Sequence, residues 1–102
     1  MIKINYLSTR IHEVMSERFR FNKHTSAKAF ILYESVLWRK ADDALKDKET
    51  SRFFYSKTEL IVADIILLMI AFLHHCGVQN IENLLRRRIE DNEEDNKHRQ
   101  HK

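Results

Sequence analysis

The chain contains one glycine, Gly77, and no proline among its 102 residues. Tight hairpins and glycine-rich phosphate-binding loops depend on residues that adopt positive φ angles, and this chain has almost none. Helices need such a residue only at their ends. We therefore predict an all-α protein, and a length near 100 residues predicts a single domain.

The composition narrows the class of protein further. Hydrophobic residues make up 43% of the chain and charged residues 32%, which suits a core with a solvated exterior and excludes wholesale disorder. The net charge is only +3, and the two signs are interspersed, which argues against nucleic-acid binding. The longest apolar run, 63–73, is shorter than the roughly 20 residues that cross a bilayer, so we expect a buried helix and no membrane span.

The single cysteine, Cys76, excludes an internal disulfide framework and suits a reducing compartment. We interpret it as a small buried hydrophobic residue. The first residues lack the basic, apolar and small-residue pattern of a secretory signal. We therefore expect a cytoplasmic protein.

Two amphipathic helices are predicted in the first half of the chain. Apolar residues recur every three or four positions over 8–20, which indicates one buried stripe. After a loop at 21–24, Thr25 or Ser26 can cap a second helix over 27–46. The residues predicted to face inward in the first helix, and to lie on or beside the buried face of the second, are Ile11, Val14, Met15 and Phe19, then Phe30, Ile31, Leu37, Trp38, Ala41 and Leu45.

Two further helices are predicted after a connection at 47–55, whose aromatic residues are expected to pack down. The segment 56–59 reads Ser-Lys-Thr-Glu and matches a capping box at the start of the third helix. Gly77 ends that helix, because glycine takes a left-handed C-terminal cap at no steric cost. Asn80 caps a fourth helix from Ile81. We take 1–90 as the domain, and expect the polar residues that follow, including the charged tail 91–102, to fray into solvent.

The third predicted helix is apolar on nearly every side, so it needs partners on every side. Three amphipathic neighbours in so short a chain do not cover it completely. We therefore predict a homo-oligomer, a dimer or a tetramer, that completes the four-helix bundle. The alternative is a compact monomeric bundle, and size-exclusion chromatography with light scattering distinguishes the two.

Several short motifs share a pattern with a known family. They are Ile11-His12-Glu13, the run Ala63-Asp64-Ile65-Ile66-Leu67-Leu68, the helix end at Gly77-Val78 with its cap at Asn80, the helix Ile81-Glu82-Asn83-Leu84-Leu85, and Arg88-Ile89 followed by Asn92 and Lys97-His98. Together they resemble the MazG-type all-α nucleotide pyrophosphohydrolases, in particular a phage-type MazG-like subgroup. The resemblance extends over residues 8–98 and implies a four-helix MazG-like bundle.

The resemblance also implies a site. In that family the acidic motifs Glu-Glu-x-x-Glu and Glu-x-x-Asp, on consecutive long helices, hold Mg²⁺, which activates water for attack on a phosphoryl group. Glu34 and Asp64 match two of these carboxylates and are the implied metal ligands, whereas Leu37 and Ile61 stand where two others belong. The implied nucleotide contacts are Arg88, Asn92 and Lys97. Asp42 and Asp43 are alternative ligands, although adjacent aspartates near a helix end are more often solvated.

Two functional classes remain open. The first is an active Mg²⁺-dependent pyrophosphohydrolase that releases pyrophosphate from a nucleoside triphosphate. The second is a descendant with weakened or lost hydrolysis that retains binding of a nucleotide or a partner, or is purely a protein-binding helical module. The broken acidic motifs favour the second class.

Other candidate sites are weaker. Adjacent residues on a helix point about 100° apart, so His74-His75-Cys76 does not form a metal site by itself. The basic run 86–88 precedes an acidic segment and indicates a solvated helix end. Trp38 and the aromatic run 53–55 have the chemistry to stack on a base, but such residues are more often core or oligomer contacts.

Overall fold

The computed structural model describes residues 3–46 and 55–100 of the chain. Four helices follow in order: α1 (Ile4–Phe19), α2 (Ala27–Ala44), α3 (Lys57–His75) and α4 (Ile81–Gln100). No strand occurs within the described ranges, so the all-α prediction is confirmed. The predicted connection over 47–55 falls, except for Tyr55, outside the described residues.

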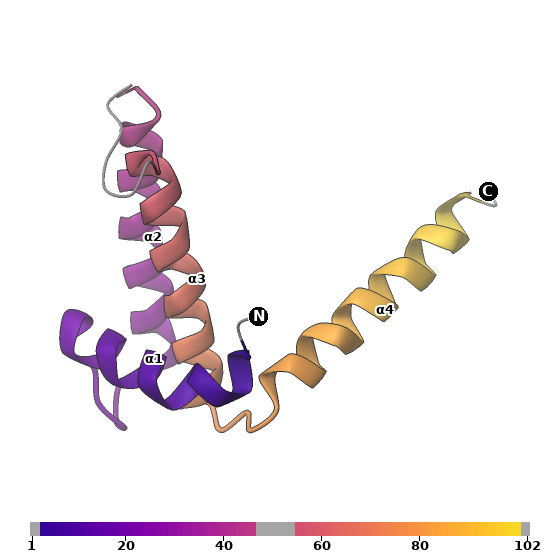
Figure 1. Ribbon diagram of the computed structural model, residues 1–102, viewed down its shortest axis with the longest axis horizontal. Helices are drawn as coiled ribbons and strands as arrows, with labels where there is room; N and C mark the ends of the chain where they lie inside the picture. The colour runs from indigo at the N-terminus through magenta and orange to yellow at the C-terminus, as the bar shows by residue number, and fades with distance from the viewer. Residues whose placement is uncertain (1–2, 47–54, 101–102) are drawn as a thin grey trace.

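The helices form an antiparallel pair with two attachments. In Figure 1, α2 and α3 run side by side in opposite directions. Helix α1 crosses this pair at the end where α2 begins and α3 ends, and α4 projects away from the pair as a single arm. The packed body of the molecule therefore consists of α1, α2 and α3.

The predicted helix caps are confirmed. The Ser26 hydroxyl accepts a hydrogen bond from the Ala29 amide at 3.4 Å. Ser56 and Glu59 form the reciprocal capping box, with bonds of 3.1 and 2.9 Å. Gly77 has φ +90° just beyond the end of α3. At the start of α4, the Asn80 side chain accepts from the Asn83 amide at 2.9 Å, so these four signals mark real helix ends.

Two predicted helix limits are wrong. Helix α1 begins at Ile4 and not at 8, because Ile4 and Leu7 extend its apolar stripe over α3. Helix α4 continues to Gln100, through residues that we expected to fray. Side-chain pairs three and four residues apart accompany this extension, including the ion pair of Arg88 with Asp91 at 3.2 Å and the contact of His98 Nε2 with Glu94 Oε1 at 3.4 Å. The assignment of 1–90 as the domain stays a prediction.

The core lies where α2, α3 and α1 meet. Leu37, Ile65 and Leu68 are almost completely buried between α2 and α3. Met15 inserts from α1 and Phe21 from the loop that follows it. This core confirms the predicted inward position of Met15 and Leu37.

Several apolar side chains that we expected to face inward are exposed instead. Val14, Ile31, Trp38 and Leu45 each have about half or more of their surface in solvent. Cys76 is also exposed, so the prediction of a buried thiol is wrong. Its position explains the difference, because Cys76 is the C-terminal cap of α3 and lies beyond the packed part of that helix.

Helix α3 is buried on part of its circumference only. It is the one helix in the described part of the chain that is long and apolar enough to cross a membrane, with a mean hydropathy of 1.8 over its most apolar window. Only 22% of that window is buried. The expectation of a buried helix therefore holds for the sides that face α1 and α2, and a third side remains uncovered.

Candidate functional site

Asp64, the first carboxylate implied by the resemblance, is paired with a cation. It lies near the middle of α3, and the Arg18 guanidinium reaches it from α1 at 2.8 Å. The two side chains keep 31% and 44% of their surface exposed. Arg18 also lies over the ring of Phe19, 5.3 Å from its centroid. The crossing of α1 over α3 thus brings a positive charge onto the predicted metal ligand.

Glu34, the second implied carboxylate, is bonded within its own helix. Its Oε1 accepts a hydrogen bond of 3.2 Å from the indole Nε1 of Trp38, one turn further along α2. Glu34 lines a small hollow together with Leu68 of α3. Asp64 precedes Leu68 by one turn, which corresponds to about 6 Å along the helix axis. The two carboxylates therefore lie at different levels of the helix pair and have different partners.

This arrangement offers magnesium no assembled set of ligands. Mg²⁺ needs near-octahedral oxygen coordination, usually with one or two carboxylates and the substrate phosphates. Here one carboxylate neutralises a guanidinium and the other accepts from an indole. Within residues 3–46 and 55–100, no group of three or more His, Cys, Asp or Glu side chains is placed to hold a metal ion. The alternative ligands Asp42 and Asp43 are exposed on α2.

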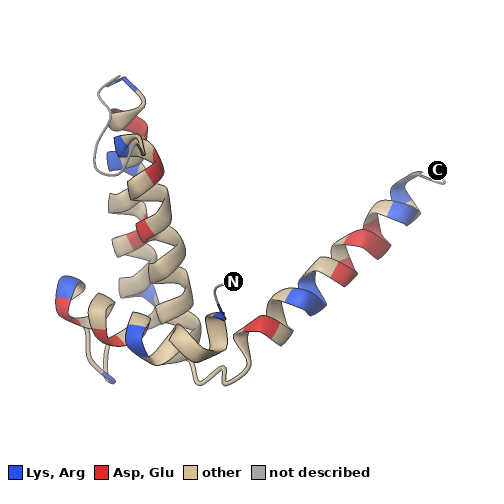
Figure 2. Ribbon diagram, viewed as in Figure 1, with Lys and Arg blue, Asp and Glu red and all other residues tan. Residues whose placement is uncertain are grey.

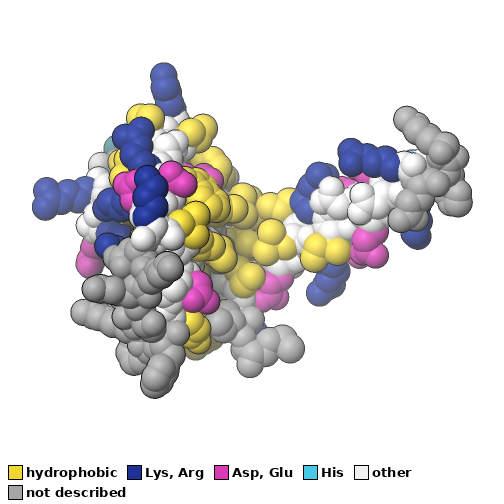
Figure 3. All heavy atoms as spheres, turned by 90° about the horizontal axis from the view of Figure 1, so that it is seen from above, with side chains coloured by type: hydrophobic (Ala, Val, Ile, Leu, Met, Phe, Trp, Pro, Cys, Tyr) yellow, Lys and Arg dark blue, Asp and Glu magenta, His cyan; other side chains and the backbone are white. Residues whose placement is uncertain are grey.

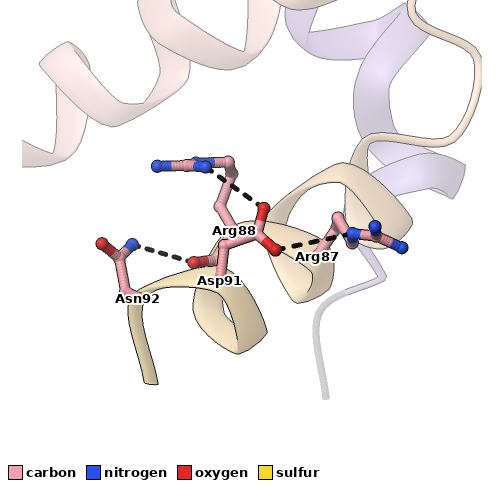
Figure 4. Close-up of polar contacts among 4 residues, drawn as sticks. All are labelled: Arg87, Arg88, Asp91 and Asn92. Carbon is pink, nitrogen blue, oxygen red and sulfur yellow. Dashed lines mark hydrogen bonds and ion pairs between the residues drawn. The ribbon is translucent and has the colours of Figure 1, made fainter. Parts of the chain in front are cut away.

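Two of the three implied nucleotide contacts are engaged within α4 (Figure 4). Arg88 donates to Asp91 at 3.2 Å, and Arg87 lies 3.6 Å from the other oxygen of the same carboxylate. The Asn92 amide donates to the Arg88 carbonyl at 2.8 Å. Lys97 lies beside the acidic residues of the same helix, in a shallow hollow that Glu90, Glu93 and Glu94 also line.

The structure does not bring the two halves of the implied site together. Helix α4 projects away from the α2–α3 pair, and charges of both signs are distributed along it (Figure 2). Arg88, Asn92 and Lys97 are all on this arm. Glu34 and Asp64 are in the body of the molecule.

A cluster of three histidines lies at the C-terminal end of α3. The His12 ring of α1 is centred 4.8 Å from that of His74 and 5.7 Å from that of His75. His75 donates to the Thr25 carbonyl at 3.1 Å. Phe21 packs against His12 and His75. The cluster therefore joins α1, α3 and the loop before α2.

The surroundings of His12 shift the pKa of its imidazole. Burial lowers the pKa of its imidazole below the ordinary value of 6.5, and the nearby His74 and His75 lower this pKa further, while Glu13 opposes the shift. The His12 Nε2 atom is buried and has no hydrogen-bond partner among the described residues. Sequence reasoning named His12 only within the motif Ile11-His12-Glu13 and missed its contact with His74, because the two residues are 62 positions apart and no local signal links them.

A second contact that sequence reasoning missed fixes the base of α4. The Asn5 side chain donates to Asn80 at 2.7 Å and accepts from the Glu82 amide at 2.9 Å. The Glu82 carboxylate accepts in turn a hydrogen bond of 3.2 Å from the backbone amide of Asn5. In the first turn of α4, the Glu82 carboxylate complements the positive end of the helix dipole. It also ties the first turn of α1 to the first turn of α4.

No protein-family model, curated protein or solved structure matches the chain.

Proposed function

We propose that this chain is a MazG-like helical protein that acts by binding and has lost the hydrolysis of the family it resembles. The ion pair between Arg18 and Asp64 carries this proposal. Hydrolysis in the resembling family depends on clustered carboxylates that are available to a metal ion. In this chain the matching aspartate neutralises a cation from the neighbouring helix, and Glu34 is bonded to Trp38 one turn away.

Two kinds of bound molecule fit this proposal. A nucleotide would contact Arg88, Asn92 and Lys97 through its phosphates, as the resemblance implies. A protein partner would cover apolar side chains that the body of the molecule leaves exposed, among them Ile66 and Met69 of α3. The exposed apolar surface favours the protein partner, because large apolar patches on a soluble protein mark interaction sites.

Pyrophosphate release tests the loss of hydrolysis. We expect no release from a panel of ordinary and modified dNTPs with Mg²⁺ or Mn²⁺, either by the natural chain or by Asp64→Ala. The variant Arg18→Met removes the competing cation, and we expect it to remain inactive, because Glu34 lies beside Leu68, one turn of α3 away from Asp64. Activity that Asp64→Ala abolishes, or activity that Arg18→Met gains, would contradict the proposal.

Thermal unfolding in the presence of dNTPs tests whether the chain binds a nucleotide. Stabilisation by dNTPs that is lost in Arg88→Ala and Lys97→Ala, but kept in the loop variant Lys23→Ala, would support nucleotide binding. The absence of any shift would exclude the nucleotide and leave the protein partner as the ligand of this module.

A further inference from the structure

A groove lies between α1 and α3, apart from the residues that the family resemblance implies. Its volume is about 480 Å³, within the range of roughly 300–1,000 Å³ that small-molecule sites occupy. Eight apolar residues and one arginine line it, and we name this set the α1–α3 groove: Ile4, Leu7, Arg10, Ile11, Val14 and Met15 of α1, with Ile66, Leu67 and Ile70 of α3. A lining that is apolar except for one or a few polar groups is typical of a small-molecule site.

The groove has a packed floor and an open mouth. Met15 and Ile70 are 2% and 8% exposed, whereas Val14 and Ile66 are 54% and 53% exposed. Hydrophobic side chains gather on the side of the body from which α4 projects, as Figure 3 shows from above. An apolar molecule that displaces water from such surface gains free energy in proportion to the area that it covers. The groove therefore offers a binding surface that the described residues leave uncovered.

The shape of the groove suits one extended hydrocarbon chain. Its α1 residues reach from Ile4 to Met15, about 16 Å along the helix axis. An extended alkyl chain advances about 1.25 Å per bond, so about 12 carbons measure about 14 Å. A docked helix is about 10–12 Å across and needs long walls on both sides. Helix α1 crosses α3 and does not run beside it, so the two do not form such walls (Figure 1).

Arg10 gives the lining of the groove its charge. Among the described residues its guanidinium forms no ion pair. A guanidinium can donate two parallel hydrogen bonds to a carboxylate, and the long side chain of arginine carries its charge to the edge of an apolar surface. An apolar trough with a cation at its edge complements a molecule that has an apolar chain and an anionic head.

We propose that the α1–α3 groove binds a single-chain carboxylate amphiphile, a free fatty acid of about 10 to 14 carbons, with its chain against α1 and α3 and its carboxylate at Arg10. The inference goes beyond the proposed function and does not depend on it, because the implied nucleotide contacts are on α4. Exposed apolar side chains outside the groove, such as Met69, remain available to a protein partner.

The charges near the groove favour a free amphiphile over a lipid bilayer. Glu13 and Glu17 follow Arg10 by one and two turns of α1, and both are exposed. Anionic membranes attract clusters of about four to eight Lys or Arg side chains, whereas the charges on this helix alternate in sign. A bilayer would bring these carboxylates to its surface, while a single chain between the helices leaves them in water.

Isothermal titration calorimetry of the full chain tests the ligand, with decanoate, dodecanoate and tetradecanoate below their critical micelle concentrations. We expect each pair of added carbons to raise the affinity about 4- to 15-fold, the range between half and complete burial of the added chain. Arg10→Met keeps an unbranched apolar stem and removes the charge. It should lower the affinity for decanoate about three- to fivefold and leave that for uncharged decanol unchanged. Arg39→Met, at an exposed arginine of α2, is the matched control.

A second substitution tests the place of binding. Ile66→Glu puts a carboxylate at the mouth of the groove and replaces a half-exposed side chain, so the helical circular dichroism should be kept. We expect it to weaken decanoate binding about tenfold or more, because like charges repel. The matched control is Val36→Glu, which replaces a half-exposed residue of α2 and should bind decanoate as the natural chain does.

The other outcomes overturn the inference. It fails if none of the three carboxylates binds, or if the affinity does not rise with chain length. Equal losses of decanoate and decanol binding in Arg10→Met would show that Arg10 does not recognise the anionic head. Binding that Ile66→Glu leaves intact overturns the choice of groove. Flotation with phosphatidylcholine vesicles that free decanoate does not displace would show that the groove binds a membrane and not a free amphiphile.

Discussion

The guanidinium of Arg18 lies 2.8 Å from the carboxylate of Asp64 and joins α1 to the middle of α3. Because both side chains remain partly exposed, we expect a modest coupling energy between them, about 0.5–1 kcal/mol. A double-mutant cycle with Arg18→Met and Asp64→Asn, measured by urea unfolding, gives this energy. A coupling of zero would mean that the pair does not hold α1 in place.

From the histidine cluster we predict that a lower pH reduces the free energy of unfolding. Burial and the neighbouring imidazoles lower the pKa of His12 in the folded state, so the unfolded chain binds more protons than the folded chain as the pH falls below about 6.5. The stability contributed by His12 is therefore complete above the unfolded pKa and is lost as the pH falls through this range. We expect the free energy of unfolding to be lower at pH 5.5 than at pH 7.5.

Substitution of His12 separates this effect from general acid destabilisation. His12→Gln should reduce the loss of stability between pH 7.5 and 5.5, since it removes the group whose protonation the fold resists. His24→Gln, in the exposed loop before α2, should leave the loss unchanged. Equal losses in the natural chain and in His12→Gln would show that the cluster does not respond to pH.

The bonds of Asn5 predict that the first turn of α1 controls the orientation of α4. Asn5→Ala removes the side-chain bonds to Asn80 and to the backbone amide of Glu82, which are exposed and partly buried, and each lost bond costs about 0.5–1.5 kcal/mol. We expect faster amide hydrogen exchange in the first turns of α4, at positions such as Leu84 and Leu85. Asn83→Ala is the control, because the structure gives its side chain no bond to α1.

If exchange in α4 is the same in Asn5→Ala and in the natural chain, Asn5 does not anchor the arm. An increase confined to α1 would also contradict the prediction, because the loss of the bond should loosen both helices that it joins.

Local signals allowed the capped helix ends to be predicted, whereas contacts between distant helices could not be. Ser56, Asn80 and Gly77 act within one turn of their own backbone, so sequence spacing alone identifies them. The pairing of Arg18 with Asp64 depends on the crossing of two helices, and no short-range pattern carries that information. The same holds for the implied metal site: sequence spacing matched Glu34 and Asp64 to the family's carboxylates, but it could not show whether the two side chains lie together.

Helix α4 shows a related limit. The residues after Ile89 have no apolar stripe, and the absence of a stripe predicted fraying. In the structure, ion pairs three and four residues apart, such as Arg88 with Asp91, accompany a helix that extends to Gln100. Apolar periodicity reports which side of a helix is buried, and it says little about a helix with no buried side.

Substitution of Gly77 tests whether the end of α3 requires a left-handed backbone conformation. Its φ of +90° lies in a region that side chains with a Cβ rarely adopt, although a Cβ placed there would meet no atom within 4 Å. Gly77→Ala should therefore cost about 1–2 kcal/mol through backbone strain and not through a clash. Gly77→Asn should cost less, because asparagine tolerates left-handed conformations. Urea unfolding measures both variants, and an alanine variant as stable as the natural chain would show that the backbone at this cap relaxes to a negative φ.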